Sequence, residues 1–250
     1  MKKPPPRPEE LQRFLNTLCA NLGKAIEDEA IPPEWLCSSD GNRNYMLHSR
    51  VCGILAKTGF DLRYIVEVGA GFDASGLMYQ FKPDVLLWDS DQLRFLIEYE
   101  STNSSDSRII DADFGHCYEA LEVARGQDAQ LPDFWVVIYT LPDHEVGNWS
   151  HHDYPKRSEA FAVMSRNPHA FYRKAFERPA LLSGPYHPDR WRKKDIRADD
   201  CHTISDCTKE ARRANREVLL INLTDGGLEI DFPKRLAKKH LFKPSSRGER

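Results

Sequence analysis

The chain has 250 residues, of which 40% are hydrophobic and 29% charged, a composition typical of a globular protein in water. Its mean hydropathy is −0.59, and no apolar run approaches the length of a membrane span, which argues against a membrane protein. No continuous apolar segment follows the positive N-terminus, so no secretory signal is expected. The six cysteines lack the spacing of a disulfide framework and indicate a reducing, cytoplasmic location.

Charge is distributed unevenly along the chain. The net charge is −3, but residues 189–250 contain 16 lysines and arginines against 11 acids, so residues 1–188 carry −8. An acidic body with a basic end suits a protein that binds a metal ion in one region and a polyanion in another. Ordinary variation of surface charge explains the pattern equally well.

The N-terminal part of the chain predicts helices followed by a strand. Apolar residues recur every three or four positions over 8–30, which is typical of an amphipathic helix, and Pro32 and Pro33 end it. A loop is expected over 38–42 and a second helix over 45–57. A strand is then expected over 63–68.

The central part of the chain predicts a series of strands. A short strand over 75–81 leads into two strands, 85–88 and 93–99, which a tight polar turn joins into a hairpin. A helix is expected over 110–125. Residues 134–140 are all apolar except the last, which indicates a strand that is buried on both faces.

The remaining residues predict an α+β extension. Its expected elements are helices over 158–165, 169–177 and 205–215, an exposed loop over 181–200, and a hairpin with strands over 218–223 and 228–232. The basic end, 234–250, is expected to fray. The predicted organisation is a flexible leader (1–9), an α/β core (10–141) and a C-terminal extension packed on the core (142–250).

Three carboxylates converge on the expected hairpin. Side chains alternate between the two faces of a strand, so Glu98 and Glu100 share one face while Tyr99 points to the other. If the two strands pair antiparallel, Asp84 at the start of the first strand lies beside both glutamates. Such a cluster costs free energy unless a cation binds it or its pKa values rise.

Pro83-Asp84, thirteen intervening residues and then Glu98-Tyr99-Glu100 resemble the PD-(D/E)xK motif of the restriction-endonuclease-like nucleases. The expected order of elements is a helix, three strands, a helix and a strand, which is also the order in the core of that superfamily. The resemblance covers residues 10–141 and implies a mixed central sheet flanked by helices, with the motif on a central hairpin. Glu100 stands where most members have lysine, as it does in some active restriction enzymes.

The resemblance implies a nuclease that depends on Mg²⁺, with Mn²⁺ as an alternative, and acts on DNA as an endonuclease. Asp84, Glu98 and the backbone carbonyl of Tyr99 would bind the metal, since Mg²⁺ prefers oxygen ligands. Glu100 would orient or deprotonate the attacking water, directly or through a second metal. One further acid would complete the metal site, and the candidates are Glu27, Glu29 and Glu67.

A basic stretch in the extension surrounds Trp191 and indicates contacts with nucleic acid. Cations next to an aromatic residue are common in such contacts. The expected phosphate ligands are Arg190, Arg192, Lys193 and Lys194. A solvated loop that Trp191 anchors in the core explains the same pattern.

Three other groups of residues favour structural explanations. Cys201, His202 and Cys207 lack the spacing of a zinc site. The histidines of the segment 151–153 are typical of a surface loop, and His116 with Tyr118 suits core packing.

Three functions are therefore open, and the metal-dependent nuclease is preferred. The second is a catalytically inactive protein of the same fold that binds nucleic acid or regulates another protein. The third is an α/β protein unrelated to nucleic acid. The alternative to a metal site is structural: Glu98 and Glu100 would lie on the solvated face of an edge hairpin, and Asp84 would cap a turn. No membrane partner is expected, and a homodimer is left open.

Overall fold

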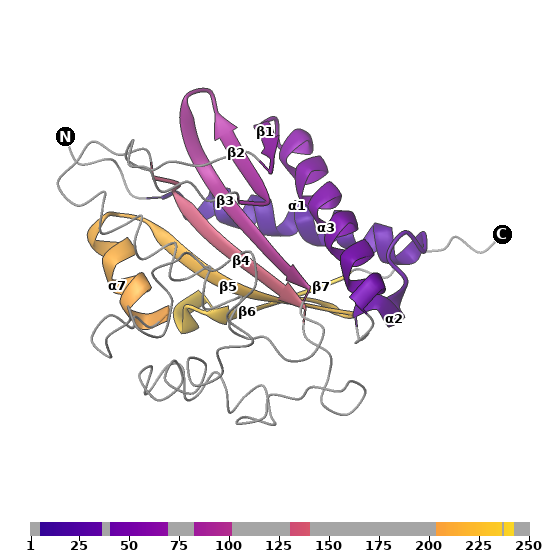
Figure 1. Cartoon of the computed structure of the whole chain (residues 1–250). Helices are drawn as coiled ribbons and strands as arrows, with labels where there is room; N and C mark the ends of the chain where they lie inside the picture. The colour runs from indigo at the N-terminus through magenta and orange to yellow at the C-terminus, as the bar shows by residue number, and fades with distance from the viewer. Residues whose placement is uncertain are drawn as a thin grey trace, which may run out of the picture.

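Seven strands form one mixed β-sheet in which each strand pairs with the next along the chain (Figure 1). In this computed structural model, the described residues are 6–36, 41–69, 83–101, 131–140, 204–236 and 238–242. The strands are β1 (Ile65–Val68), β2 (Val85–Asp89), β3 (Gln92–Ser101), β4 (Phe134–Thr140), β5 (Glu217–Thr224), β6 (Gly227–Phe232) and β7 (Lys239–Leu241). Neighbouring strands are antiparallel except at β3–β4 and β4–β5, which are parallel.

Helices α1 (Pro8–Glu27) and α3 (Gly41–Asp61) cover one face of this sheet, and the short α2 (Pro33–Leu36) lies between them in sequence (Figure 1). The apolar stripe of α1 is buried, as its spacing predicted. Phe14 of this stripe stacks on Phe95 of β3 at 4.5 Å between ring centroids, and Phe95 stacks on Phe134 of β4 at 4.8 Å. The main hydrophobic core therefore lies between α1, α3 and the sheet.

The central strands are buried on both faces. All seven residues of β4 are buried, which agrees with the apolar run that predicted this strand. Side chains on the other face of the sheet, away from α1 and α3, are buried as well, for example Leu86, Leu96 and Leu220. Helix α7 (Ile204–Arg213) packs against β5. The strands beyond residue 204 thus continue the sheet that the strands before residue 141 begin.

An acid between two arginines links the starts of three central strands. Asp133 lies 2.6 Å from Arg94 of β3 and 3.2 Å from Arg216, which directly precedes β5. The backbone N–H of Asp133 also donates to the carbonyl of Leu93, and its carbonyl accepts from the N–H of Glu217. These contacts set the alignment of β3, β4 and β5 at one end of the sheet, away from Asp84.

Two regions differ from the sequence-based expectation. The expected loop 38–42 ends early, because α3 already begins at Gly41. The end of the chain, 234–250, was expected to fray, and this was wrong for the 3₁₀ helix η4 (Lys234–Leu236) and for residues 239–241, which form β7. β7 pairs with β6, and the Cys19 thiol of α1 donates to the carbonyl of His240 at 3.2 Å. Such a short strand carries little pattern of its own, so tertiary contacts decide its conformation.

Several predicted elements lie outside the described residues. They are the strand over 75–81, the helices over 110–125, 158–165 and 169–177, and the loop over 181–200. Within the described ranges, no helix is both long enough and apolar enough to cross a membrane.

Candidate metal centre

The hairpin of β2 and β3 brings Asp84 next to Glu98. Val85 is opposite Ile97 in the antiparallel register, so the residues that follow this pair outward are Asp84 and Glu98. The backbone N–H of Asp84 donates to Glu98 Oε2 at 3.2 Å, and Asp84 Oδ2 accepts from the backbone N–H of Tyr99 at 2.8 Å. The two carboxylates therefore lie at one end of a hairpin that is inside the sheet.

Glu98 is a buried acid that forms no ion pair with a basic side chain among the residues that the structure describes. Its side chain is only 7% exposed. Burial raises the pKa of Glu98 well above its ordinary value, and the negative charges of Asp84 and Glu100 raise it further, while the Asp84 N–H and His48 partly oppose this shift. Glu98 thus favours its neutral form until a positive charge arrives.

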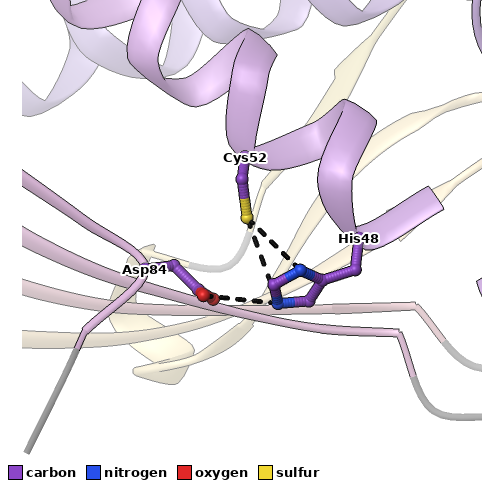
Figure 2. A group of neighbouring side chains, drawn as sticks. All are labelled: His48, Cys52 and Asp84. Atoms are coloured by element: carbon purple, nitrogen blue, oxygen red, sulfur yellow. Dashed lines mark hydrogen bonds and ion pairs between the residues drawn. The ribbon is translucent and has the colours of Figure 1, made fainter. Parts of the chain in front are cut away.

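Helix α3 contributes two residues that the sequence analysis did not select. His48 Nε2 lies 3.3 Å from Asp84 Oδ1, and the His48 ring lies 5.6 Å from the ring of Tyr99. Cys52 lies one helical turn further on, with its Sγ 3.7 Å from His48 Nδ1 and 4.0 Å from Nε2 (Figure 2). Among the described residues, His48, Cys52 and Asp84 offer ligand atoms that all lie within 4.8 Å of one another.

Charge inside this group favours a protonated imidazole. Burial lowers the pKa of His48, but the hydrogen bond that His48 donates to Asp84 and then the contact with Cys52 outweigh burial and raise the pKa to about 11. The pKa of the Cys52 thiol is raised, chiefly by burial, although the hydrogen bond with His48 lowers it. In the metal-free protein, His48 therefore supplies the positive charge beside Asp84.

The other predicted residues have different surroundings. Glu100 is half-buried on β3 and close enough for its charge to raise the pKa of Glu98. The side chain of Tyr99 is fully buried on the helix-covered face, where its hydroxyl bonds Thr140 Oγ1 at 2.8 Å. Any role of Tyr99 at the metal is thus limited to its backbone carbonyl.

The candidate upstream acids do not join this group. Glu67 is exposed on the edge strand β1 and accepts a hydrogen bond from Trp88 Nε1 at 2.9 Å. Glu27 and Glu29 are exposed at the end of α1. The helical side chains that approach Asp84 come from α3 instead. The proposed phosphate ligands Arg190, Arg192, Lys193 and Lys194 lie outside the described residues.

One signal in the sequence would have identified His48 and Cys52. They are four positions apart in the segment 45–57, which was expected to be helical, so they share one helix face. Which element that face contacts depends on the tertiary packing of α3 against the sheet.

No family model, no curated protein and no solved structure matches the chain. The candidate site therefore rests on the chemistry of this chain. Asp84, Glu98 and Glu100 provide hard oxygen ligands of the kind that Mg²⁺ and Mn²⁺ prefer, whereas His48 and Cys52 add a nitrogen and a sulfur. Asp84 lies between the two sets.

Replacing Glu98 by glutamine should stabilise the metal-free protein at neutral and alkaline pH. The pKa of Glu98 is raised in the folded state, so protonated Glu98 contributes to the free energy of unfolding. This contribution is fully present below the pKa of the unfolded state and is lost as the pH rises through the pKa of the folded state. Glutamine keeps an oxygen for the Asp84 N–H and carries no charge. We expect a gain of about 1 kcal/mol at pH 8 and a smaller difference at pH 5.

Urea unfolding with EDTA at both pH values measures this difference. Glu34→Gln is the matched control, since Glu34 is exposed on α2. A Glu98→Gln variant that loses stability equally at both pH values would show that the ionisation of Glu98 carries no cost.

Proposed function

We propose that the protein is a metal-dependent nuclease that hydrolyses phosphodiester bonds in DNA as an endonuclease. The observation that carries this proposal is the contact between Asp84 and the buried Glu98 at the end of the β2–β3 hairpin. A buried acid beside a second carboxylate is unfavourable without a cation and favourable around a divalent one. The mixed sheet with this hairpin inside it is also the arrangement that the PD-(D/E)xK resemblance implies.

The residues present fit a site for Mg²⁺ or Mn²⁺. Asp84, Glu98 and the backbone carbonyl of Tyr99 would hold the ion through oxygen atoms. When bound, the ion would polarise the phosphate and lower the pKa of an attacking water. Glu98 would lose its proton, and Asp84 Oδ1 would exchange its contact with His48 for the cation.

Glu100 would act on the attacking water as a general base. It lies on the same face of β3 as Glu98, and its half-buried position leaves it access to solvent. A positioned base contributes about 10²–10⁴-fold to the rate. Unlike the lysine of most relatives in the proposed superfamily, Glu100 cannot neutralise charge on the phosphate, so activity should depend strongly on the metal.

A cleavage assay on duplex and single-stranded DNA tests this proposal. The purified full-length chain should cut or nick DNA with Mg²⁺ or Mn²⁺ and be inactive with EDTA. Glu100 in the position of lysine favours one alternative, a protein that binds nucleic acid without cutting it. DNA binding that weakens steeply with salt, without cleavage at any metal concentration, would support that alternative. If the chain neither binds nor cuts DNA, both functions are wrong.

A further inference from the structure

We propose that His48, Cys52 and Asp84 form a binding site for a transition-metal ion of the Zn²⁺ type. Two of the side chains come from α3 and the third from the residue directly before β2, and their ligand atoms all lie within 4.8 Å of one another (Figure 2). This site differs from the proposed Mg²⁺ site in its ligands and shares only Asp84 with it.

The ligand chemistry selects the class of metal. Zn²⁺ binds thiolate sulfur, imidazole nitrogen and carboxylate oxygen, whereas Mg²⁺ takes oxygen ligands almost exclusively. Three protein ligands with one open position are the arrangement of zinc sites that bind water or a substrate atom. A histidine and a second ligand four positions apart on one helix face also occur in zinc-binding helices.

The distance between nitrogen and oxygen matches a tetrahedral site, and the sulfur lies further away. With zinc–ligand bonds of about 2.0–2.3 Å, the edge between nitrogen and oxygen is about 3.4 Å and that between nitrogen and sulfur about 3.5 Å. His48 Nε2 lies 3.3 Å from Asp84 Oδ1 and 4.0 Å from Cys52 Sγ. Cys52 Sγ lies closer to Nδ1, at 3.7 Å, than to Nε2. The His48 ring and the Cys52 side chain must therefore both rotate before one ion can bind Nε2, the sulfur and Asp84 Oδ1 together.

The surroundings hold the ligands in position. The Tyr99 N–H binds Asp84 Oδ2, which leaves Oδ1 facing His48. A hydrogen bond to the second oxygen of a ligating carboxylate orients it for the metal. Buried leucine and valine side chains anchor the neighbouring row of α3: Leu47, Val51 and Leu55.

An ion can reach this site through His48. The side chain of His48 is 35% exposed, whereas Cys52 beneath it is only 7% exposed. Asp84 also contacts solvent, with 21% of its side chain exposed, so an ion can meet both of these ligands before it reaches Cys52.

Sharing Asp84 has a consequence for the nuclease, and this consequence rests on the proposed function. Asp84 Oδ1 cannot face a Zn²⁺ ion held by His48 and Cys52 and, at the same time, a Mg²⁺ ion beside Glu98. Zn²⁺ would thus displace Mg²⁺ from Asp84 and inhibit cleavage.

Titration with Co²⁺ of the reduced full-length protein tests the metal site without any assay of activity. We expect one tightly bound equivalent, with the thiolate-to-cobalt charge-transfer absorption and the intense visible bands of a tetrahedral ion. Zn²⁺ should abolish both signals, and Mg²⁺ should leave them unchanged. The Cys52→Ser variant should lack the thiolate band, and His48→Gln should lower the affinity by about 100-fold or more.

Cys19→Ser is the matched control. Cys19 is the other buried cysteine among the described residues, and its thiol bonds the backbone carbonyls of His240 and Leu241. This variant should keep the complete Co²⁺ spectrum. Circular dichroism of each variant checks folding, and if Cys52→Ser fails to fold, the half-exposed His48→Gln carries the test alone.

Three outcomes would each overturn the proposal. They are the absence of a thiolate band in the wild-type protein, the persistence of that band in Cys52→Ser, and an undiminished Co²⁺ affinity in His48→Gln. Because the spectrum does not depend on DNA, a Co²⁺ site in a protein without cleavage would contradict the nuclease and leave the metal site intact. If the protein cleaves DNA, inhibition by Zn²⁺ should need at least about tenfold more metal in Cys52→Ser than in Cys19→Ser.

Discussion

The Asp84→Asn variant should lose Mg²⁺-dependent DNA cleavage by about 10³-fold or more, since the stabilisation of charge by a bound metal is worth several kcal/mol. Asparagine matches aspartate in shape, and its carbonyl oxygen can still accept the N–H of Tyr99, which Asp84 accepts at 2.8 Å. The substitution removes the charge that would attract the cation. The rate of plasmid nicking at saturating Mg²⁺ measures the effect.

The control for Asp84→Asn is Asp225→Asn. Asp225 is exposed in the turn between β5 and β6, so this variant makes the same chemical change away from the hairpin of β2 and β3. It should cleave DNA at the wild-type rate. If Asp84→Asn retains more than about a tenth of wild-type activity, Asp84 is not a metal ligand in the reaction. Thermal unfolding of both variants with EDTA separates loss of activity from loss of structure.

The Phe95→Ala variant should destabilise the fold by about 3–5 kcal/mol, the usual cost of removing a buried phenylalanine. Phe95 is fully buried on β3 and stacks between Phe14 of α1 and Phe134 of β4, while the ring of Tyr64 meets it edge-on at 5.8 Å. Alanine leaves a cavity between a helix and two strands that cannot easily close. Urea unfolding at pH 7 measures the loss.

Phe60→Ala is the control for this prediction. Phe60 lies on α3 with 64% of its surface exposed, so its removal should change the free energy of unfolding by no more than about 0.5 kcal/mol. A loss below about 1 kcal/mol in Phe95→Ala would mean that the stacked rings do not form the centre of the core.

The sequence was sufficient for elements whose patterns are local. The amphipathic spacing over 8–30 predicted α1, and the apolar run over 134–140 predicted β4 with its observed bounds. The polar turn between two apolar segments predicted the β2–β3 hairpin. That hairpin also accounts for the contact of Asp84 with Glu98, because antiparallel pairing brings the start of one strand beside the end of the next.

Elements with weak local patterns were missed. β7 has three residues, too few to show a periodicity, and forms because β6 and α1 provide its partners. The early start of α3 at Gly41 was missed because a Gly-Asn pair is typical of a turn. In both regions, contacts distant in sequence override local preference.

The residues of the candidate site also divide into those that the sequence predicted and those that only the tertiary structure brings together. By itself, the sequence determined the acidic side of the site, since Asp84, Glu98 and Glu100 follow from strand alternation and a single hairpin. Only the tertiary structure decided that His48 and Cys52 contact Asp84, because the rotation of α3 on the sheet depends on how its apolar face packs against α1 and the strands. Helix periodicity predicts which residues share a face, and the packed core decides what that face meets.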